Sequence, residues 1–293
     1  MDWKTMERRP RIDGHTLLAG VIGWPVAHSR SPLMHNFWLE QRGINGAYVP
    51  LPVAPGAFDV AVRGLQAAGF RGVNVTIPHK ESAYRIVDRL DRSAQRSGSV
   101  NTLVFAPDGR IEGYSTDGDG FVANVEAHGI PVRGGRALLL GAGGAARAIA
   151  ASLLDRGVDV VVANRTRARA DALAAQLAGI TVIDWAGADE LLPSCRFVVN
   201  TTSIGMEGGA DATLPLDLSR ADAGLVVCDI VYVPRQTALL RQAAERGLRT
   251  VDGLGMLIHQ AGLGFEKWFG ATPDIGPEVE ALLDADLHRV HAG

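Results

Sequence analysis

The sequence contains few cysteines and no long uncharged segment. Its 293 residues include only two cysteines, Cys195 and Cys228, each in or beside an apolar run. This pattern predicts buried, reduced thiols rather than a disulfide or a metal site. The longest segments without Asp, Glu, Lys or Arg have 16 residues, fewer than the roughly 20 apolar residues of a membrane-spanning helix. We therefore expect a cytoplasmic protein that binds no metal and does not span a membrane.

The sequence also lacks an excess of basic residues. Lys and Arg number 29 against 32 Asp and Glu, so the formal net charge is −3. Domains that bind nucleic acid usually gather Lys and Arg on one face, because neutralised phosphates release counterions. We expect no nucleic-acid partner. The oligomeric state stays open.

Short β-branched runs alternate with amphipathic stretches along most of the chain, which predicts an α/β protein with parallel sheets. At about 150 residues per domain, the length favours two domains. In the first part we predict strands near 16–22, 46–51, 70–75 and 99–106, and helices near 31–42, 55–68 and 79–90.

A second series of strands begins at Arg136. Its runs are short and almost wholly apolar, which is typical of strands buried on both faces of a doubly wound parallel sheet. After this series, two helices are expected to return to the first domain. The predicted strands are 137–140, 158–163, 180–183, 197–200 and 225–229, and the helices are 255–268 and 277–290.

A glycine-rich motif follows the first strand of this second series and opens an alanine-rich helix. Gly141 permits a tight turn, and Gly143 lets backbone amides approach a pyrophosphate at the positive end of the helix. Between a strand and a helix, the motif favours a dinucleotide site over a flexible loop. The motif is Gly141-Ala142-Gly143-Gly144-Ala145-Ala146.

The next strand ends without the acidic residue that usually binds the ribose of NAD. Asn164 stands there, followed by Arg165, Thr166, Arg167 and Arg169. Guanidinium groups bind a phosphate through paired hydrogen bonds, so the cluster favours NADP. If a helix begins near Thr166, Arg165 and Arg169 would reach one phosphate from the same side. The alternative is a solvated basic helix start.

Polar residues interrupt otherwise apolar segments of the first domain. Ser29 and Ser31 precede a helix, Lys80 follows a strand, Asn101 lies within a strand, and Asp117 precedes a helical stretch. Three of these residues have an ordinary alternative: Ser31 and Asp117 could cap helices, and Lys80 could be a solvated charge. Four such segments in one domain are harder to explain by capping alone.

With these segments and the glycine motif, the sequence resembles the shikimate dehydrogenase family over nearly its whole length. Members reduce 3-dehydroshikimate to shikimate with NADPH, and they consist of a substrate domain and a Rossmann-type domain. The resemblance implies domains of residues 1–117 plus 253–293 and of residues 118–252. The matching segments are Ala27–Pro32, Asn74–Glu81, Val100–Leu103, Thr116–Gly118, Gly141–Ala146, Asn164–Thr166 and Asp252–Ala261.

The resemblance also implies roles for individual residues. Lys80 and Asp117 match the catalytic pair, and Tyr232 matches a tyrosine near the substrate. Residues implied to bind the substrate, a hydroxylated ring carboxylate, are Ser29 and Ser31 at its carboxylate and Thr76, Asn101 and Gln260 at its ring hydroxyls. Residues implied to bind NADP are Gly141, Ala142, Gly143, Gly144, Ala145, Asn164, Arg165, Thr166, Arg169 and Gly253.

Three positions depart from the usual pattern of the family. His79 replaces an aromatic residue before the lysine, Ser115 an asparagine before Thr-Asp-Gly, and Ser99 an alanine before Val-Asn-Thr. Because these positions adjoin substrate residues, a paralogue that acts on quinate or aminoshikimate, with NADP or NAD, is an alternative. A non-catalytic sensor is a further one, which the presence of both Lys80 and Asp117 disfavours.

Overall fold

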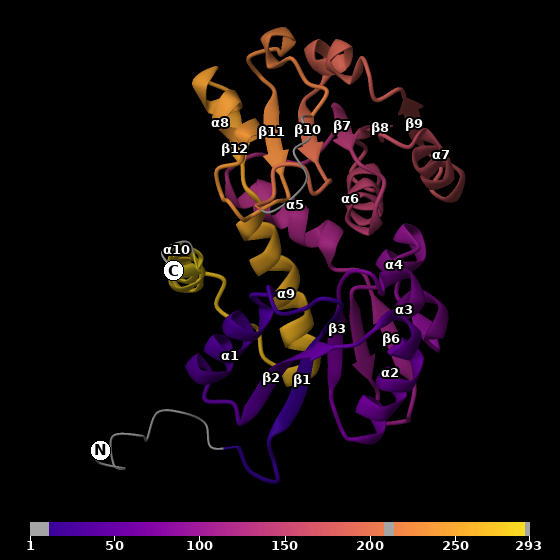
Figure 1. Cartoon of the computed structure of the whole chain (residues 1–293), viewed down its shortest axis with the longest axis vertical. Coiled ribbons are helices and arrows are strands. Elements are labelled where there is room, and N and C mark those ends of the chain that lie inside the picture. Colours follow the sequence, from indigo (N-terminus) through magenta and orange to yellow (C-terminus); the bar gives the residue numbers. More distant parts are fainter. Residues whose placement is uncertain (1–11, 208–213, 291–293) are drawn as a thin grey trace. The chain divides into compact units, whose positions relative to one another are not determined.

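The computed structural model describes residues 12–207 and 214–290. Its contacts divide the chain into two compact units, each with helices and a sheet (Figure 1). Unit 1 comprises Met1–Gln95, Ser99–Thr116 and Ala261–Gly293, and unit 2 comprises Arg96–Gly98 and Asp117–Gln260. The contacts therefore assign residues 253–260 to unit 2, whereas the sequence led us to expect them in the first domain.

The sheet of unit 1 has the strand order β2-β1-β3-β5-β6-β4. β1 pairs in parallel with β2 and β3. The strands are β1 Leu17–Gly23, β2 Gly46–Pro52, β3 Gly72–Val75, β4 Arg89–Leu90, β5 Thr102–Phe105 and β6 Ile111–Tyr114. The helices that accompany them are α1 Ser31–Gln41, α2 Phe58–Ala67, α3 Lys80–Ile86, α4 Arg92–Ser97 and α10 Pro277–Val290.

The prediction of a parallel sheet is wrong for one strand of unit 1, β5. β5 runs antiparallel to β3, with Asn74 opposite Thr102, and β6 runs antiparallel to β5. The turn around Gly109, whose φ is 85°, connects β5 directly to β6. A connection this short joins only antiparallel strands. The predicted helix 79–90 is also too long, because α3 ends at Ile86 and β4 follows.

Unit 2 contains the predicted doubly wound sheet, with the order β12-β11-β10-β7-β8-β9 and parallel pairing throughout. Its strands are β7 Arg136–Leu140, β8 Asp159–Ala163, β9 Ile180–Ile183, β10 Phe197–Asn200, β11 Val226–Asp229 and β12 Arg249–Val251. Its helices are α5 Asp117–Ala127, α6 Gly144–Leu154, α7 Arg167–Gln176 and α8 Ala238–Glu245.

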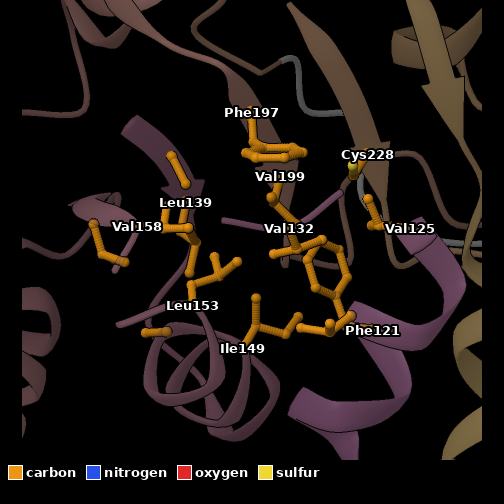
Figure 2. Packing of buried hydrophobic residues seen from close by; sticks show 14 of the residues in the cluster. Phe121, Val125, Val132, Leu139, Ile149, Leu153, Val158, Phe197, Val199 and Cys228 are labelled. Atoms are coloured by element: carbon orange, nitrogen blue, oxygen red, sulfur yellow. The ribbon is translucent and has the colours of Figure 1, made fainter. Parts of the chain in front are cut away.

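Alternate residues of these strands fill two cores on opposite faces of the sheet. Leu139 packs with Ile149 of α6 and Phe121 of α5 in the first core (Figure 2). Its neighbour Leu138 belongs to the second core, together with Leu240 of α8. Because side chains alternate along a strand, a strand covered on both faces is apolar on both of its sides and not only at alternate positions. This explains the continuous apolar runs in the sequence.

The last part of the chain returns to unit 1, as expected. Helix α9, Gly253–Phe269, begins in unit 2 and ends in unit 1. Near its end, the Trp268 indole donates a hydrogen bond to the Leu103 carbonyl of β5 at 2.9 Å. The Trp38 indole of α1 donates to the Asp274 carbonyl at 2.9 Å. These two bonds attach the C-terminal segment to the sheet and to α1.

Two further expectations concern thiols and the membrane. Cys195 and Cys228 are buried free thiols, as predicted. Within residues 12–207 and 214–290, no helix is long and apolar enough to cross a membrane. The same residues contain no group of His, Cys, Asp and Glu side chains that could hold a metal ion.

Candidate functional site

Polar residues of unit 1 gather at one edge of its sheet. The parallel strands β1 and β3 end together, with Ile22 opposite Val75, and the Thr76 amide donates to the Ile22 carbonyl at 2.9 Å. Antiparallel β5 starts at this edge, where the Val75 amide donates to the Asn101 carbonyl at 2.7 Å. The loop after β1, Thr76 and Asn101 therefore share one edge of the sheet.

Asn101 connects the segments that carry the two catalytic candidates. The Lys80 carbonyl, at the start of α3, accepts from the Val100 amide at 3.3 Å. The Asn101 amide group donates to the Thr116 hydroxyl at 2.9 Å and accepts from the Thr116 backbone at 2.9 Å. Asp117 follows Thr116 directly and is only 7% exposed. Both candidates thus border residues that are fixed around Asn101.

Asn101 is also held by a buried hydrogen-bond network that the sequence did not reveal. The Tyr48 hydroxyl donates to the side-chain oxygen Oδ1 of Asn74 at 2.6 Å. The Asn74 amide donates to the Asn101 carbonyl at 3.2 Å and to the Thr102 hydroxyl at 3.1 Å. The His35 ring stacks on Tyr48 at 4.0 Å, and burial lowers the pKa of His35 to about 3, so the ring is neutral. An asparagine inside the apolar run Gly72–Val75 was the available signal.

Ser31 is not a helix cap. Helix α1 begins at Ser31, and the residue in the cap position is Arg30. The Ser31 amide donates to the Ser29 hydroxyl oxygen at 3.3 Å, so Ser29 accepts a helix N–H in place of Ser31. Arg30 forms an ion pair with Asp286 of α10 at 2.8 Å. The cap alternative for Ser31 is therefore wrong, and its buried hydroxyl has no capping role.

His79 fills a buried position beside the catalytic candidate Lys80. Its ring stacks on Phe58 of α2 with 4.8 Å between the ring centres. One ring nitrogen lies 2.7 Å from the Val53 carbonyl. The imidazole thus supplies the flat ring expected at this position in the family and adds a hydrogen bond. This bond ties the start of α3 to the segment after β2.

In unit 2, the glycine motif forms the connection between β7 and α6. Gly141 has a φ of 116°, and an added Cβ would lie 2.5 Å from the Thr201 hydroxyl oxygen. Gly143 is exposed at the start of α6, with a φ of −86°, and a Cβ added there would meet only open space. Gly141 is therefore needed by the fold itself. Gly143 leaves room at a helix N-terminus, where backbone N–H groups attract anions.

The condition for aligning Arg165 with Arg169, a helix that includes both residues, is not met. Helix α7 begins at Arg167, and Thr166 occupies the cap position with an extended backbone. Arg165 therefore precedes the helix, so a four-residue spacing does not align it with Arg169. The Asn164 side chain donates to the Thr166 carbonyl at 2.8 Å and supports this turn after β8.

The arginines of this cluster differ in their partners. Arg167 forms ion pairs with Asp184 at 2.6 Å and with Asp171 at 3.7 Å. Arg165 and Arg169 are exposed, and their guanidinium groups form no ion pair with any residue that the structure describes. They are the two arginines of the cluster that remain available to an external phosphate.

Asp229, at the end of β11, was not singled out from the sequence. It is 2% exposed. Its Oδ1 accepts from the Asn200 amide at 2.9 Å and from the Val231 backbone at 3.0 Å, and its Oδ2 accepts from the Thr237 hydroxyl at 2.8 Å. Burial raises the pKa of Asp229 to about 6, although these hydrogen bonds oppose the shift. The signal was present, since Asn200 and Asp229 are polar ends of apolar runs.

The remaining site candidates of unit 2 lie in the loop after β11 and in α9. Tyr232 is half-buried in that loop. Gly253 opens α9, and a Cβ there would lie 2.3 Å from the Ile230 carbonyl. Gln260 is buried and its amide donates to the Leu257 carbonyl at 3.0 Å. Ser29, Ser31, Thr76, Lys80 and Asn101 belong to unit 1, whereas Asp117, Tyr232 and Gln260 belong to unit 2.

Three family models match consecutive parts of this chain. The shikimate dehydrogenase substrate binding domain matches residues 21–103, and shikimate / quinate 5-dehydrogenase matches residues 125–254. The shikimate 5'-dehydrogenase C-terminal domain matches residues 253–283. The chain belongs to the shikimate dehydrogenase family.

Individual relatives agree with the family models. A shikimate dehydrogenase (NADP(+)) from Gluconobacter oxydans (strain 621H) is 57% identical over 276 residues, which are 94% of this chain and 98% of the relative. A Thermus thermophilus shikimate 5-dehydrogenase, solved with NADP(H) and shikimate, has a TM-score of 0.82 and 40% identity, covering 92% of this chain and 100% of that one. A further shikimate dehydrogenase, solved with NADP+, has a TM-score of 0.88 and 35% identity, covering 94% and 97%.

Proposed function

We propose that this protein catalyses the reversible, NADP-dependent reduction of 3-dehydroshikimate to shikimate. The observation that carries the proposal is the hydrogen-bonded edge around Asn101, which holds the segments of Lys80 and Asp117. The Gluconobacter relative bears this activity in its name. The Thermus relative was solved with NADP(H) and shikimate.

In the proposed reaction, bound NADPH supplies the hydride. Negative charge develops on the carbonyl oxygen of the ketone, and a positioned donor must stabilise and protonate that oxygen. We assign this role to the Lys80 ammonium group, and we assign to the Asp117 carboxylate the role of holding the ammonium group in place. Proton transfer of this kind contributes about 10²–10⁴-fold in rate.

The substrate is proposed to bind through neutral polar groups. Hydroxyl groups donate well to a carboxylate, which suits Ser29 and Ser31. Amide and hydroxyl side chains both donate and accept, as recognition of ring hydroxyls requires. We assign Thr76, Asn101 and Gln260 to this task, and Tyr232 to a neighbouring contact.

The chain offers a suitable site for NADP. The free N–H groups at the start of α6, next to the open position at Gly143, would hold the pyrophosphate. Arg165 and Arg169 would bind the 2′-phosphate, and Asn164 presents no carboxylate to repel it. We also assign Gly253, at the start of α9, to the cofactor; the Ile230 carbonyl fills the space of its missing Cβ, so only its backbone could make the contact.

The decisive experiment is a steady-state assay of NADP+ reduction with the purified protein. Shikimate, quinate and aminoshikimate are each compared with NADP+ and NAD+. We expect the highest kcat/KM for shikimate with NADP+. A higher value for quinate or aminoshikimate would assign the protein to a paralogue. Binding without turnover of any substrate would indicate a sensor.

The compartment is part of the proposal as well. Buried free thiols at Cys195 and Cys228 are in keeping with the reducing cytoplasm. Fractionation of the source cells tests this assignment, and recovery of the protein outside the cytoplasmic fraction would contradict it.

A further inference from the structure

The loop that carries Tyr232 is held by one buried carboxylate. The amide of Val231, one residue before Tyr232, donates to Asp229 at 3.0 Å. The Thr237 hydroxyl, at the far end of the loop, donates to the other oxygen of Asp229 at 2.8 Å. Asn200, at the end of β10, donates to Asp229 at 2.9 Å. A single side chain thus joins both ends of the loop to the neighbouring strand.

A second set of contacts fixes the same loop near both of its ends. Arg235 binds Asp252 through Nε at 3.1 Å and through Nη2 at 2.6 Å. The loop backbone at Ile230 also lies so close to Gly253 that a Cβ there would be 2.3 Å from the Ile230 carbonyl. The loop is therefore attached to the start of α9 as well as to β10.

We propose that Asp229 is a positioning residue, which holds the loop from Ile230 to Gln236 so that Tyr232 is presented to the substrate in one orientation. The proposal rests on the proposed function, because it takes Tyr232 as a substrate contact. Asp229 itself touches no reacting group and acts through the loop.

The geometry explains why a buried carboxylate is used here. Oδ1 accepts from two donors on different segments and Oδ2 accepts from a third. No ion pair to Asp229 occurs in the described part of the chain, so hydrogen bonds alone satisfy it. A buried donor that loses its acceptor destabilises the folded state, because the cost of removing it from water is no longer offset by a hydrogen bond. Removal of Asp229 would leave the Val231 amide and the Thr237 hydroxyl without an acceptor.

Two substitutions separate the geometry of this residue from its charge. D229N keeps an oxygen at Oδ1 for both of its donors, and its amide group can donate to Thr237, whose hydroxyl then accepts. D229A removes every contact. D217A is the matched control, since Asp217 also accepts a backbone N–H in unit 2, from Ser219 at 2.9 Å, but in a different loop.

The first measurement does not depend on activity. Amide hydrogen exchange is followed by mass spectrometry for the loop residues 230–237 in the full-length proteins. We expect exchange in D229A to be faster by roughly tenfold or more, as the loss of a buried hydrogen bond to a charged group implies. D229N and D217A should resemble the wild type. Unchanged exchange in D229A would overturn the proposal.

The second measurement compares the effect of each substitution on the KM for shikimate with its effect on the Kd for NADP+. We expect D229A to raise the KM for shikimate by about tenfold or more, with the Kd for NADP+ nearly unchanged and D229N close to the wild type. Equal losses for shikimate and NADP+, or equal impairment of D229N and D229A, would overturn the positioning role. Faster exchange in D229A, together with a wild type inactive on shikimate, supports the held loop and overturns the proposed function alone.

Discussion

The two units prepare their candidate sites with different parts of the polypeptide. In unit 1 the edge of the sheet is composed of side chains that bind one another, with Asn74 and Asn101 at the centre. In unit 2 the corresponding edge at β7 and α6 presents backbone, because Gly141 and Gly143 have no side chains. Recognition in unit 1 therefore depends on which side chains are present. Recognition in unit 2 depends on where a Cβ is absent and an N–H is free.

This difference follows from the chemistry of the proposed ligands. A ring with several hydroxyls is distinguished from its relatives only by donors and acceptors at defined positions. A pyrophosphate is an anion that any correctly placed helix N-terminus can bind. Substitutions of single polar atoms should thus be most damaging in unit 1, and additions of single carbon atoms in unit 2.

The largest effect is expected for the catalytic candidate of unit 1. Lys80→Ala should lower kcat by about 10²–10⁴-fold with little change in KM, because the lysine serves proton transfer and not binding. Steady-state assays with shikimate and NADP+ measure both constants. Asp117→Asn should be severely impaired as well. Lys267→Ala is the matched control, since this lysine lies over the Tyr114 ring and has no assigned role in the reaction. Retention of more than about a tenth of kcat in Lys80→Ala would remove the lysine from the reaction.

The next effect tests the free arginines of unit 2. Exchange of both Arg165 and Arg169 for Ala should lower kcat/KM for NADP+ by about a hundredfold or more, because two charge-assisted contacts to a phosphate are lost. Use of NAD+ should change little. Arg167→Ala should leave the preference intact, because Arg167 already binds Asp184 and Asp171. A wild type that prefers NAD+ would show that this cluster is only a solvated helix start.

Two glycine substitutions sharpen the contrast between fold and site within unit 2. Gly141→Ala should lower the free energy of unfolding by about 1–3 kcal/mol, because its φ of 116° and the nearby Thr201 exclude a Cβ. Gly143→Ala should leave stability unchanged and weaken NADP+ binding, because the added Cβ would block only the approach of the pyrophosphate. Thermal unfolding and cofactor titration separate the two effects. Equal NADP+ affinity in Gly143→Ala and the wild type would place the pyrophosphate elsewhere.

A comparable effect, on substrate binding and not on stability, is expected at the serines of unit 1. Ser29→Ala or Ser31→Ala should raise the KM for shikimate, by the equivalent of about 1.5–3 kcal/mol for a lost hydrogen bond to a charged group. kcat should change less, because a hydroxyl that binds the carboxylate does not act on the ketone. The double variant provides the strict test. An unchanged KM in that variant would leave both serines without a role in substrate binding.

The smallest effect is a pH dependence of stability in unit 2. The pKa of Asp229 is raised from 3.8 to about 6, so the folded state holds a proton that the unfolded state has lost between these pH values. Protonation of Asp229 therefore stabilises the folded state. This stabilisation is complete below about pH 4 and disappears as the pH rises through 6. Between pH 4.5 and pH 7 it should amount to about 1–2 kcal/mol. Denaturant unfolding of the wild type and D229N over this range tests it, since the difference should fall with pH and level off above 7. A constant difference would contradict the raised pKa.

The local sequence pattern was sufficient to predict the elements whose structure is decided by burial alone. The apolar runs in 137–140 and 197–200 form β7 and β10, because strands covered on both faces are apolar except at their ends. The motif at Gly141 was also readable, since the turn between β7 and α6 requires a positive φ that glycine adopts readily. Each of these features depends on neighbours within a few residues.

Strand direction and partner choice were not readable in this way. The antiparallel pairing of β5 and β3 joins Asn74 to Thr102, residues distant in the sequence. The bond from Tyr48 to Asn74 likewise connects separate strands. A tyrosine in a strand looks the same in the sequence whether its hydroxyl meets solvent or a buried amide. Such contacts are therefore found only once the sheet is assembled.

The sequence by itself determined the α/β class, the doubly wound sheet of unit 2 and the residue types available at both candidate sites. Only the tertiary structure decided which of those residues are held, and by what. It assigned Arg167 to Asp184 and left Arg165 and Arg169 available, and it placed Asp229 between Asn200, Val231 and Thr237. The physical reason is range: burial and backbone preference act on each residue and its neighbours, whereas a hydrogen bond between segments exists only after the chain has brought them together.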